Sequence, residues 1–414
     1  MRLYIDPGTG SMLFTILIGL LGTVLYFLRD AKVRLRFIFS GGKKTENADS
    51  RVPFAIFTDS KRYWNLFEPI CDQFEQRGLP MLYLTASPDD PALEKEYSHI
   101  TARFVGEGNR AFANVNFLKA DVVLSSTPGL DVYQWKRSKD VKYYIHIAHA
   151  ANDPAMYRMF GLDFFDAVAV SGEYQKRQIR EIEKKHNAKE KELPMLGLPH
   201  MDALLHRLES AEPLPHSETT VLLAPSWGPN GVFRRFGSQI LDELLRTGYH
   251  IIVRPHPQTL ATEKDLIEPI MARYPDSEQL EWNTDNDNFD VLRRADVLIS
   301  DFSGVIFDYA LVFQRGIIYT DVSYDKSAFD AWWLDEELWT FETLPKFGLK
   351  LTSENLPELK GMIDEIMHND AYKEAIAAAR AETWSCIGRS AELIADFAIE
   401  KQKELASSTT ADEQ

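Results

Sequence analysis

The 414-residue sequence contains only two cysteines, Cys71 and Cys386, and they lie far apart. With so few thiols, neither a disulfide framework nor a cysteine metal cluster is expected, and a reducing compartment is the default. The chain also lacks an excess of basic residues, because its formal net charge is −16, which argues against nucleic acid as a partner. It has no internal repeat and no long low-complexity tract. Its hydrophobic share of 45% is enough for two ordinary α/β domains.

One stretch near the N-terminus has no charged residue. Residues 11–28 are apolar apart from Ser, Thr, Gly and one Tyr, and these 18 residues are at the short end of what crosses a bilayer. Residues 29–44 carry six basic side chains and one acidic one, so the positive-inside rule places everything after residue 28 in the cytoplasm. A cleaved signal peptide is the alternative, but bulky residues followed by Arg29 do not form a small-residue cleavage site. We therefore expect residues 1–50 to be a membrane anchor with a basic juxtamembrane segment.

Short apolar runs alternate with longer amphipathic runs along the rest of the chain. This alternation predicts right-handed βαβ units in parallel sheets, arranged in two series. The first series has strands at residues 53–57, 81–84, 121–124, 142–147 and 167–170, with helices at 64–77 and 173–185. The second has strands at 220–223, 249–253, 279–282, 295–299 and 316–319, helices at 237–246, 263–273 and 305–313, and closing helices at 355–367 and 371–400.

A polar, proline-containing segment at residues 209–219 separates the two series, as a linker would. The predicted fold is therefore α/β, with two Rossmann-like domains that face one cleft, preceded by one transmembrane helix. We place the first domain at residues 51–208 and the second, with the closing helices, at residues 220–400. Residues 401–414 are predicted to be a polar tail that frays at its end.

A turn of small polar residues follows the fourth strand of the second series. It reads Ser300-Asp-Phe-Ser-Gly304 and leads into the helix at 305–313. A helix that begins on such a turn presents unpaired N–H groups and the positive end of its dipole, which suits a phosphate. Arg254 and His256 follow the strand at 249–253. Because the carboxyl ends of parallel strands share one edge of a sheet, where open α/β folds bind ligands, these residues predict a nucleotide-diphosphate site.

Each of these residues also has a structural explanation. Arg254 could form a salt bridge, although a fixed guanidinium at a strand end suits phosphate oxygens. Asp301 and Ser303 could cap the helix, which is compatible with phosphate binding. The prolines on both sides of His256 fix its backbone, which favours a functional role. Three further carboxylates could bind a ribose hydroxyl or a metal ion, or face water: Asp308, Asp321 and Asp325.

Two histidines lie at the end of the strand at 142–147. His146 and His149 have the spacing of half a metal site, but no cysteine or carboxylate cluster nearby completes one, so metal ligation is not predicted. In an extended segment the two side chains point to opposite faces. His149 is followed by the small residues Ala150 and Ala151, so we expect it to face the cleft and His146 to face the core.

Several motifs together resemble the signature of the CDP-glycerol glycerophosphotransferase family, whose members prime or polymerise teichoic acid and related phosphopolymers. The resemblance covers roughly residues 140–325 and rests on Gly197-Leu-Pro-His-Met-Asp202, Ala224-Pro-Ser-Trp227, Arg254-Pro-His-Pro257, Ser300-Asp-Phe-Ser-Gly304, Phe307-Asp-Tyr-Ala-Leu311 and Tyr319-Thr-Asp321. It implies a membrane-associated enzyme of the bacterial cell envelope with a GT-B-like fold. It also implies transfer of glycerol phosphate from CDP-glycerol to a hydroxyl, with one histidine from each domain, here His149 and His256.

The chain departs from the family pattern at two positions. The family commonly has His-Gly-Thr where this chain has His149-Ala-Ala, and a second serine where Gly304 stands. The expected donor is therefore CDP-glycerol, CDP-ribitol or another CDP-alditol, and the acceptor is a hydroxyl of a membrane-associated glycan or lipid. The predicted nucleotide- and phosphate-binding residues are Ser226, Arg254, Ser300, Asp301, Ser303, Gly304, Asp308 and Asp321.

The predicted chemistry assigns a role to each histidine. His149 is the general base for the acceptor hydroxyl, while His256 and Arg254 stabilise the leaving CMP. No cofactor is required, and Mg²⁺ is an optional addition. The expected location is the bacterial inner membrane, with a single span and cytoplasmic catalytic domains. A GT-B glycosyltransferase that uses a nucleotide sugar and a non-catalytic membrane-tethered binding protein are the alternatives.

Overall fold

The computed structural model describes residues 51–414 except 215–217, 286, 321–323 and 413–414. The chain divides into two units, residues 1–51 and 52–414, and every described helix and strand lies in the second. The predicted membrane anchor at residues 11–28 and the predicted ligand Asp321 lie outside the described residues. Among the helices that are described, none is long and apolar enough to cross a membrane.

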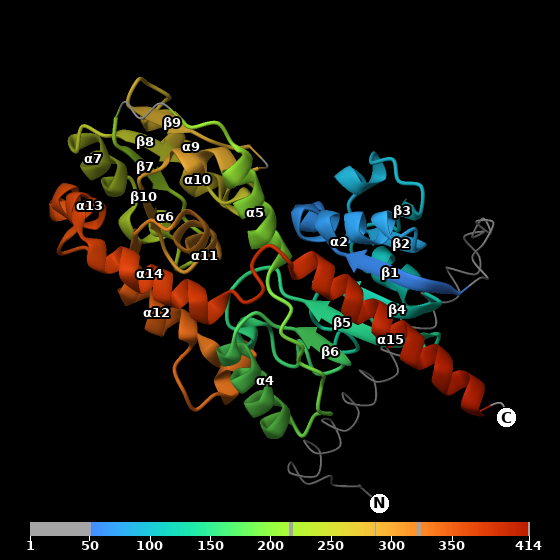
Figure 1. Cartoon of the computed structure of the whole chain (residues 1–414). Coiled ribbons are helices and arrows are strands. Elements are labelled where there is room, and N and C mark those ends of the chain that lie inside the picture. Colours follow the sequence, from blue (N-terminus) through green and yellow to red (C-terminus); the bar gives the residue numbers. More distant parts are fainter. Residues whose placement is uncertain (1–50, 215–217, 286, 321–323, 413–414) are drawn as a thin grey trace, which may run out of the picture. The chain divides into compact units, whose positions relative to one another are not determined.

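The first series of strands forms one six-stranded parallel sheet in the order β3-β2-β1-β4-β5-β6 (Figure 1). This is the strand order of a Rossmann sheet. The strands are β1 (Val52–Thr58), β2 (Met81–Thr85), β3 (Ile100–Phe104), β4 (Ala120–Ser125), β5 (Val141–Ile147) and β6 (Ala167–Ala169). Five of them confirm the predicted strands. The sixth, β3, was not predicted because it is an edge strand with exposed Thr101 and Phe104, and so has no continuous apolar run.

The second series forms another six-stranded parallel sheet, in the order β12-β11-β10-β7-β8-β9. Its strands are β7 (Thr220–Leu223), β8 (His250–Val253), β9 (Leu280–Trp282), β10 (Val297–Ser300), β11 (Ile317–Thr320) and β12 (Gly348–Leu351). The unpredicted strand, β12, is again at an edge of its sheet. It was not predicted because it carries the exposed Lys350 and follows the helix α12 (Trp339–Phe347) without a turn. The predicted fold class of two parallel α/β sheets is confirmed.

Helices connect and cover the strands of both sheets. Those of the first series are α2 (Trp64–Gln76), α3 (Asn109–Val115), α4 (Glu173–His186) and α5 (Pro199–Ser210). Those of the second are α6 (Val232–Phe236), α7 (Gln239–Arg246), α8 (Pro257–Thr262), α9 (Lys264–Arg273), α10 (Phe289–Arg294), α11 (Val305–Phe307), α12 (Trp339–Phe347), α13 (Leu359–His368) and α14 (Asp370–Thr383). The predicted helix at 305–313 is present, but after α11 it continues as a π-helical segment, Asp308–Val312.

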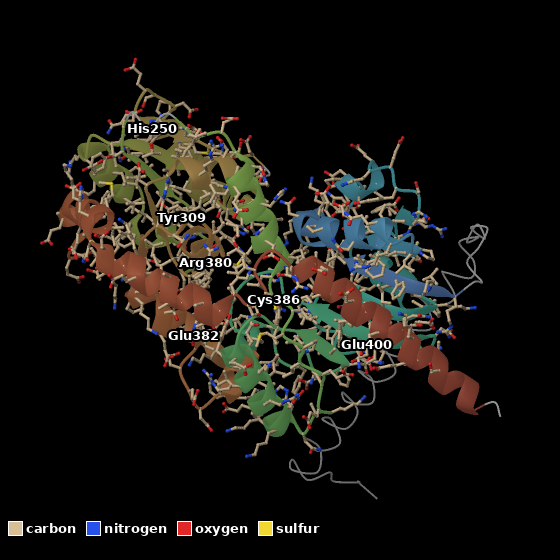
Figure 2. The ribbon with its side chains drawn as sticks, in the orientation of Figure 1. His250, Tyr309, Arg380, Glu382, Cys386 and Glu400 are labelled. Atoms are coloured by element: carbon tan, nitrogen blue, oxygen red, sulfur yellow. The ribbon has the colours of Figure 1, made fainter. Side chains whose placement is uncertain are left out.

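The prediction of one closing helix at 371–400 within the second domain is wrong. The helix ends at Thr383, and a new helix, α15 (Ser390–Asp412), begins after a loop that contains Cys386 (Figure 2). The Asp202 carboxylate fixes this loop, because it accepts hydrogen bonds from Trp384 Nε1 and from the N–H groups of Gly388 and Ser390, each at 2.9 Å.

The helix α15 then packs on the first sheet rather than the second (Figure 1). Ile394, Ala395 and Ala398 are fully buried in the core that β1, β4 and α2 share. The helix also continues to Asp412, through the segment for which we predicted a polar tail. The chain therefore crosses back to the first sheet at the loop that Asp202 holds.

The two series meet through the segments that follow β5 and β6 in the first and β11 in the second. One hydrophobic core contains Ala151 and Tyr174 of the first series together with Trp339 of the second. The ring centroids of Tyr174 and Trp339 are 4.5 Å apart and the rings are stacked. In addition, the Asp330 carboxylate accepts a hydrogen bond from the Phe160 N–H at 2.7 Å. The loops and helices that follow the strands of the two sheets are therefore in direct contact.

Candidate functional site

His149 stands just past the end of β5 and is partly buried, whereas His146 on β5 is fully buried, as predicted. Both contact the hydroxyl of Tyr157, at 3.4 Å from His149 Nδ1 and 3.1 Å from His146 Nε2. The Tyr63 ring also lies near His149, with a centroid distance of 5.1 Å. A cavity of about 180 Å³ opens beside these groups. His149 is therefore held by two aromatic side chains, neither of which was predicted.

The surroundings of His149 keep its imidazole neutral at physiological pH. Burial, together with the smaller effect of the positive charge of Arg62, lowers the pKa of His149 to about 4. Burial likewise lowers the pKa of His146 to about 3. A neutral imidazole can accept a proton, which is the property that a general base needs.

The turn after β10 is organised by the side chain of Asp301. This carboxylate is fully buried and accepts hydrogen bonds from the N–H groups of Ser226 at 2.8 Å, Phe302 at 2.8 Å and Ser303 at 3.2 Å. Asp301 therefore joins the loop after β7 to the turn after β10. This is a structural role, which the sequence had left open for Asp301 beside phosphate binding. The Ser303 N–H, which we expected to be open to a phosphate, is used in this network.

Two predicted ligands are buried among protein groups instead. The Ser300 hydroxyl has no exposed surface and donates a hydrogen bond to the Ala224 carbonyl at 2.6 Å, so in this structure it does not reach the cleft. The Asp308 carboxylate is also buried and lies 3.2 Å from His200 Nε2. For these two residues the structure favours a role in packing over direct binding of a phosphate or ribose.

His200 itself was not predicted as a site residue. Burial alone would lower the pKa of His200, but the charge of Asp308 and the hydrogen bond to it raise the pKa overall. The charge of His200 in turn lowers the pKa of His149. His200 also lines a cavity of about 900 Å³ between α2, α5 and the start of α15. In the sequence, His200 could have been found through the motif Gly197-Leu-Pro-His-Met-Asp202, but that motif was used only as evidence for the family resemblance.

Gly304 and Ser303 are the parts of the turn that face the first series. A Cβ atom at Gly304 would lie 3.5 Å from Asn152 Oδ1 and 3.8 Å from Ala150 Cβ, which places this turn directly against the segment that follows His149. Ser303 and Gly304 are both partly exposed. Ser226 lies next to them through its bond to Asp301, and its buried hydroxyl has no hydrogen-bond partner among the residues described.

Gly304→Ser is expected to fold with a free energy of unfolding within about 0.5 kcal/mol of the unchanged chain. The distances at Gly304 are ordinary contacts, and a serine hydroxyl there could donate to Asn152 Oδ1, which is buried without a partner. Gly197→Ala is the contrast, because Gly197 has φ +82° and its Cβ would meet Ser390 Oγ at 2.3 Å. Urea unfolding should show that this second variant loses about 2 kcal/mol or more. An equal loss in both would contradict the geometry.

Arg254 follows β8 and is held by the segment that follows β9. Its guanidinium donates to Asn283 Oδ1 and to the Asp285 carbonyl, the latter at 2.7 Å. Burial lowers the pKa of Arg254, while the charges of Asp285 and Asp287 raise it. The charges of these two carboxylates thus already compensate part of the charge of Arg254. Its role as a phosphate ligand stays a prediction.

His256 occupies the N-cap of α8, directly after Pro255. Its Nδ1 accepts a hydrogen bond from the Gln258 N–H at 3.0 Å, so in the neutral ring the proton is on Nε2. Burial lowers the pKa of His256, and the charge of Arg62 lowers it as well. His256 thus offers an N–H donor. Since Arg62 influences both His149 and His256, the two histidines are near the same positive charge.

No metal site is evident from the part of the chain that the structure describes, in which no group of three or more His, Cys, Asp or Glu side chains is placed to hold an ion. Whether the reaction uses Mg²⁺ stays a prediction.

A family model described as CDP-Glycerol:Poly(glycerophosphate) glycerophosphotransferase matches residues 149–340. The match begins at His149 and contains His256 and the turn at 300–304. Over these residues the chain is similar to this family. The predicted family is confirmed, and the chain is a transferase. No curated protein sequence matches it.

Solved structures resemble this chain in fold. A histidine-to-asparagine variant of the wall teichoic acid polymerase TagF, soaked with CDPG, has 18% identity and a TM-score of 0.56, and the match covers 85% of this chain and 89% of that one. UDP-GlcNAc 2-epimerase from Neisseria meningitidis, bound to UDP-GlcNAc, has 12% identity and a TM-score of 0.54 over 84% of this chain and 99% of its own. At such identities the likeness shows a shared GT-B-like fold, and substrates do not follow from it.

Proposed function

We propose that this transferase moves glycerol phosphate, or a related alditol phosphate, from a CDP-activated donor to a hydroxyl of a membrane-associated glycan or lipid, and releases CMP. The family match supports the donor class, because the family description names CDP-glycerol. The observation that carries the proposal is the placement of His149 and His256. They come from different sheets, are both made less basic by burial, and are both influenced by Arg62.

The proposed reaction starts at His149. If Nδ1–H of His149 donates to the Tyr157 hydroxyl, then Nε2 is unprotonated and can take the proton of the acceptor hydroxyl. The acceptor oxygen forms a bond to the phosphorus of the glycerol phosphate group as the bond from that phosphorus to the CMP oxygen breaks. The electron pair of the broken bond stays on CMP, whose phosphate gains negative charge.

His256 and the turn at 303–304 would stabilise this leaving group. The Nε2–H of His256 can donate to a CMP oxygen, since Nδ1 is already used by the Gln258 N–H. Phosphoryl transfer depends mainly on positioning and on electrostatic stabilisation, which a fixed donor supplies at little reorganisation cost. The acceptor would approach from the first sheet, where His149 lies. Residues 11–28 would anchor the chain, with the catalytic residues on the cytoplasmic side of the bacterial inner membrane.

His256→Ala is expected to lower turnover with CDP-glycerol by about 10²-fold or more, because it removes one stabilising donor at the leaving phosphate. The measurement is release of CMP from radiolabelled CDP-glycerol in the presence of lipid-linked saccharide acceptors. His250→Ala is a matched control, since His250 contacts Arg294 and the Glu278 carbonyl, away from the turn at 303–304. Near-normal turnover of the His256 variant would show that the assignment is wrong.

Nucleotide binding tests the donor class directly. CMP and CDP-glycerol should raise the melting temperature of the full chain, while UDP, GDP and their sugars should not, because only a ligand that binds the folded state stabilises it. Stabilisation by UDP-sugars with none by CDP-glycerol would instead support a nucleotide-sugar glycosyltransferase. Binding of CDP-glycerol without release of CMP would support a binding protein.

A further inference from the structure

The loop after β1 brings an arginine to His149 from a part of the chain that the family match does not include. Arg62 belongs to a short 3-10 helix, Lys61–Tyr63, on the first sheet. Its guanidinium carbon lies 4.8 Å from the centroid of the Tyr63 ring, and that ring lies 5.1 Å from the imidazole of His149. The three groups therefore form a continuous row that ends at the predicted general base.

Within the described residues, Arg62 forms no salt bridge with a carboxylate. The side chain of Arg62 is exposed. Its neighbour Lys61 forms an ion pair with Asp89. The Asp59 carboxyl is close enough to feel the charge of Arg62, but burial raises the pKa of Asp59, which favours its neutral form. Arg62 is thus a positive charge with an open face beside two neutral imidazoles.

The backbone around Arg62 is fixed. The Ser60 side chain accepts a hydrogen bond from the Arg62 N–H, and the Ser60 carbonyl accepts one from the Tyr63 N–H at 3.2 Å. The Lys61 N–H donates to Ser87 Oγ at 3.0 Å. Because the backbone at Arg62 is already ordered before a ligand arrives, little backbone entropy is lost on binding.

We propose that Arg62 binds the phosphate of the group that is transferred, as distinct from the phosphate that leaves with CMP. This proposal rests on the proposed function. Arg62 and His149 both stand on the first sheet, from which the acceptor would attack, while His256 and the turn at 303–304 stand on the second and would hold CMP. A guanidinium can bind two phosphate oxygens at once, and it stabilises the charge that these oxygens carry during transfer.

The test compares Arg62→Ala with Lys61→Ala in the full chain, since the two residues are adjacent, exposed or partly exposed, and equal in charge. Binding of CDP-glycerol and of CMP is measured by calorimetry, and turnover by CMP release. Arg62→Ala is expected to weaken CDP-glycerol binding about 10- to 100-fold and to leave CMP binding unchanged. Lys61→Ala should change neither by more than about twofold. Arg62→Lys should recover part of the lost affinity, because lysine restores the positive charge but cannot bind two phosphate oxygens at once as a guanidinium does.

Two results would overturn the proposal. One is an Arg62→Ala variant that binds CDP-glycerol as the Lys61→Ala variant does. The other is an equal loss of CMP and CDP-glycerol affinity, which would place Arg62 on the leaving phosphate. Melting curves of each variant show whether it is folded, and Arg62→Gln replaces the alanine variant if that one is not. If the unchanged chain binds CMP but not CDP-glycerol, the proposed donor fails, and this proposal fails with it.

Discussion

An enzyme in which His149 is replaced by alanine is expected to release CMP from CDP-glycerol about 10²- to 10⁴-fold more slowly than the unchanged chain. The alanine cannot take the proton of the acceptor hydroxyl, and the neighbouring His146 cannot replace it, because His146 is fully buried and contacts the Tyr157 hydroxyl. The loss should appear in turnover, with CDP-glycerol affinity changed little. Single-turnover measurements with saturating donor separate the two effects.

The control for this variant is His99→Ala. His99 is an exposed histidine directly before β3, where it pairs with Glu75. It lies far in sequence from the site residues. It should keep normal turnover and a normal melting temperature. If His149→Ala loses less than about tenfold, His149 is not the base, since general bases contribute about 10²-fold or more.

The pH dependence of the reaction carries a related signature. Because the folded-state pKa of His149 is about 4, the imidazole is in its base form above that pH and becomes protonated below it. The acid limb of kcat/KM, which reports the free enzyme, should therefore lie near pH 4 and not near the ordinary value of 6.5. The acid limb of kcat should lie at higher pH, because the bound donor brings negative charge that favours the protonated imidazole. An acid limb of the kcat/KM profile near pH 6.5 would contradict the burial of His149.

The strands that the sequence revealed are those whose side chains are buried on both faces. β1, β5, β7 and β10 show as apolar runs because most of their side chains are buried, as in a parallel sheet that is covered on both faces. The edge strands β3 and β12 could not be found in this way, since each has exposed side chains, whereas the edge strands β6 and β9 have none and were predicted. The break between α14 and α15 was also hidden, because it depends on Asp202, which comes from a distant segment.

The candidate site was predictable to the extent that it depends on local sequence. His256 between two prolines and the turn at 300–304 were recognisable as motifs. The functions of Ser300, Asp301 and Asp308 depend on partners in distant segments: Ala224, Ser226 and His200. Arg62 and Tyr157 stand in no motif. Their importance arises only when the loops after β1 and β5 are brought together, which no local pattern encodes.

The largest expected effect on stability comes from Asp153, which joins the two series. Its buried carboxylate accepts hydrogen bonds from the Trp339 N–H at 2.7 Å and the Thr340 N–H at 2.9 Å, and also from the side chains of Thr340 and Gln178. These two N–H groups begin the helix α12, so the carboxylate also meets the positive end of that helix.

Asp153→Ala is expected to lower the free energy of unfolding by about 3–5 kcal/mol, because it leaves buried donors of both series without an acceptor. Asp153→Asn should lose less, since its amide oxygen still accepts one or two of these bonds. Asp335→Ala, which removes an exposed carboxylate paired with Lys185, should change the free energy by no more than about 0.5 kcal/mol. Urea unfolding followed by tryptophan fluorescence measures all three. A loss in Asp153→Ala no larger than that in Asp335→Ala would mean that the contact between Asp153 and α12 contributes little, and that the stacking of Tyr174 on Trp339 is what holds the two series together.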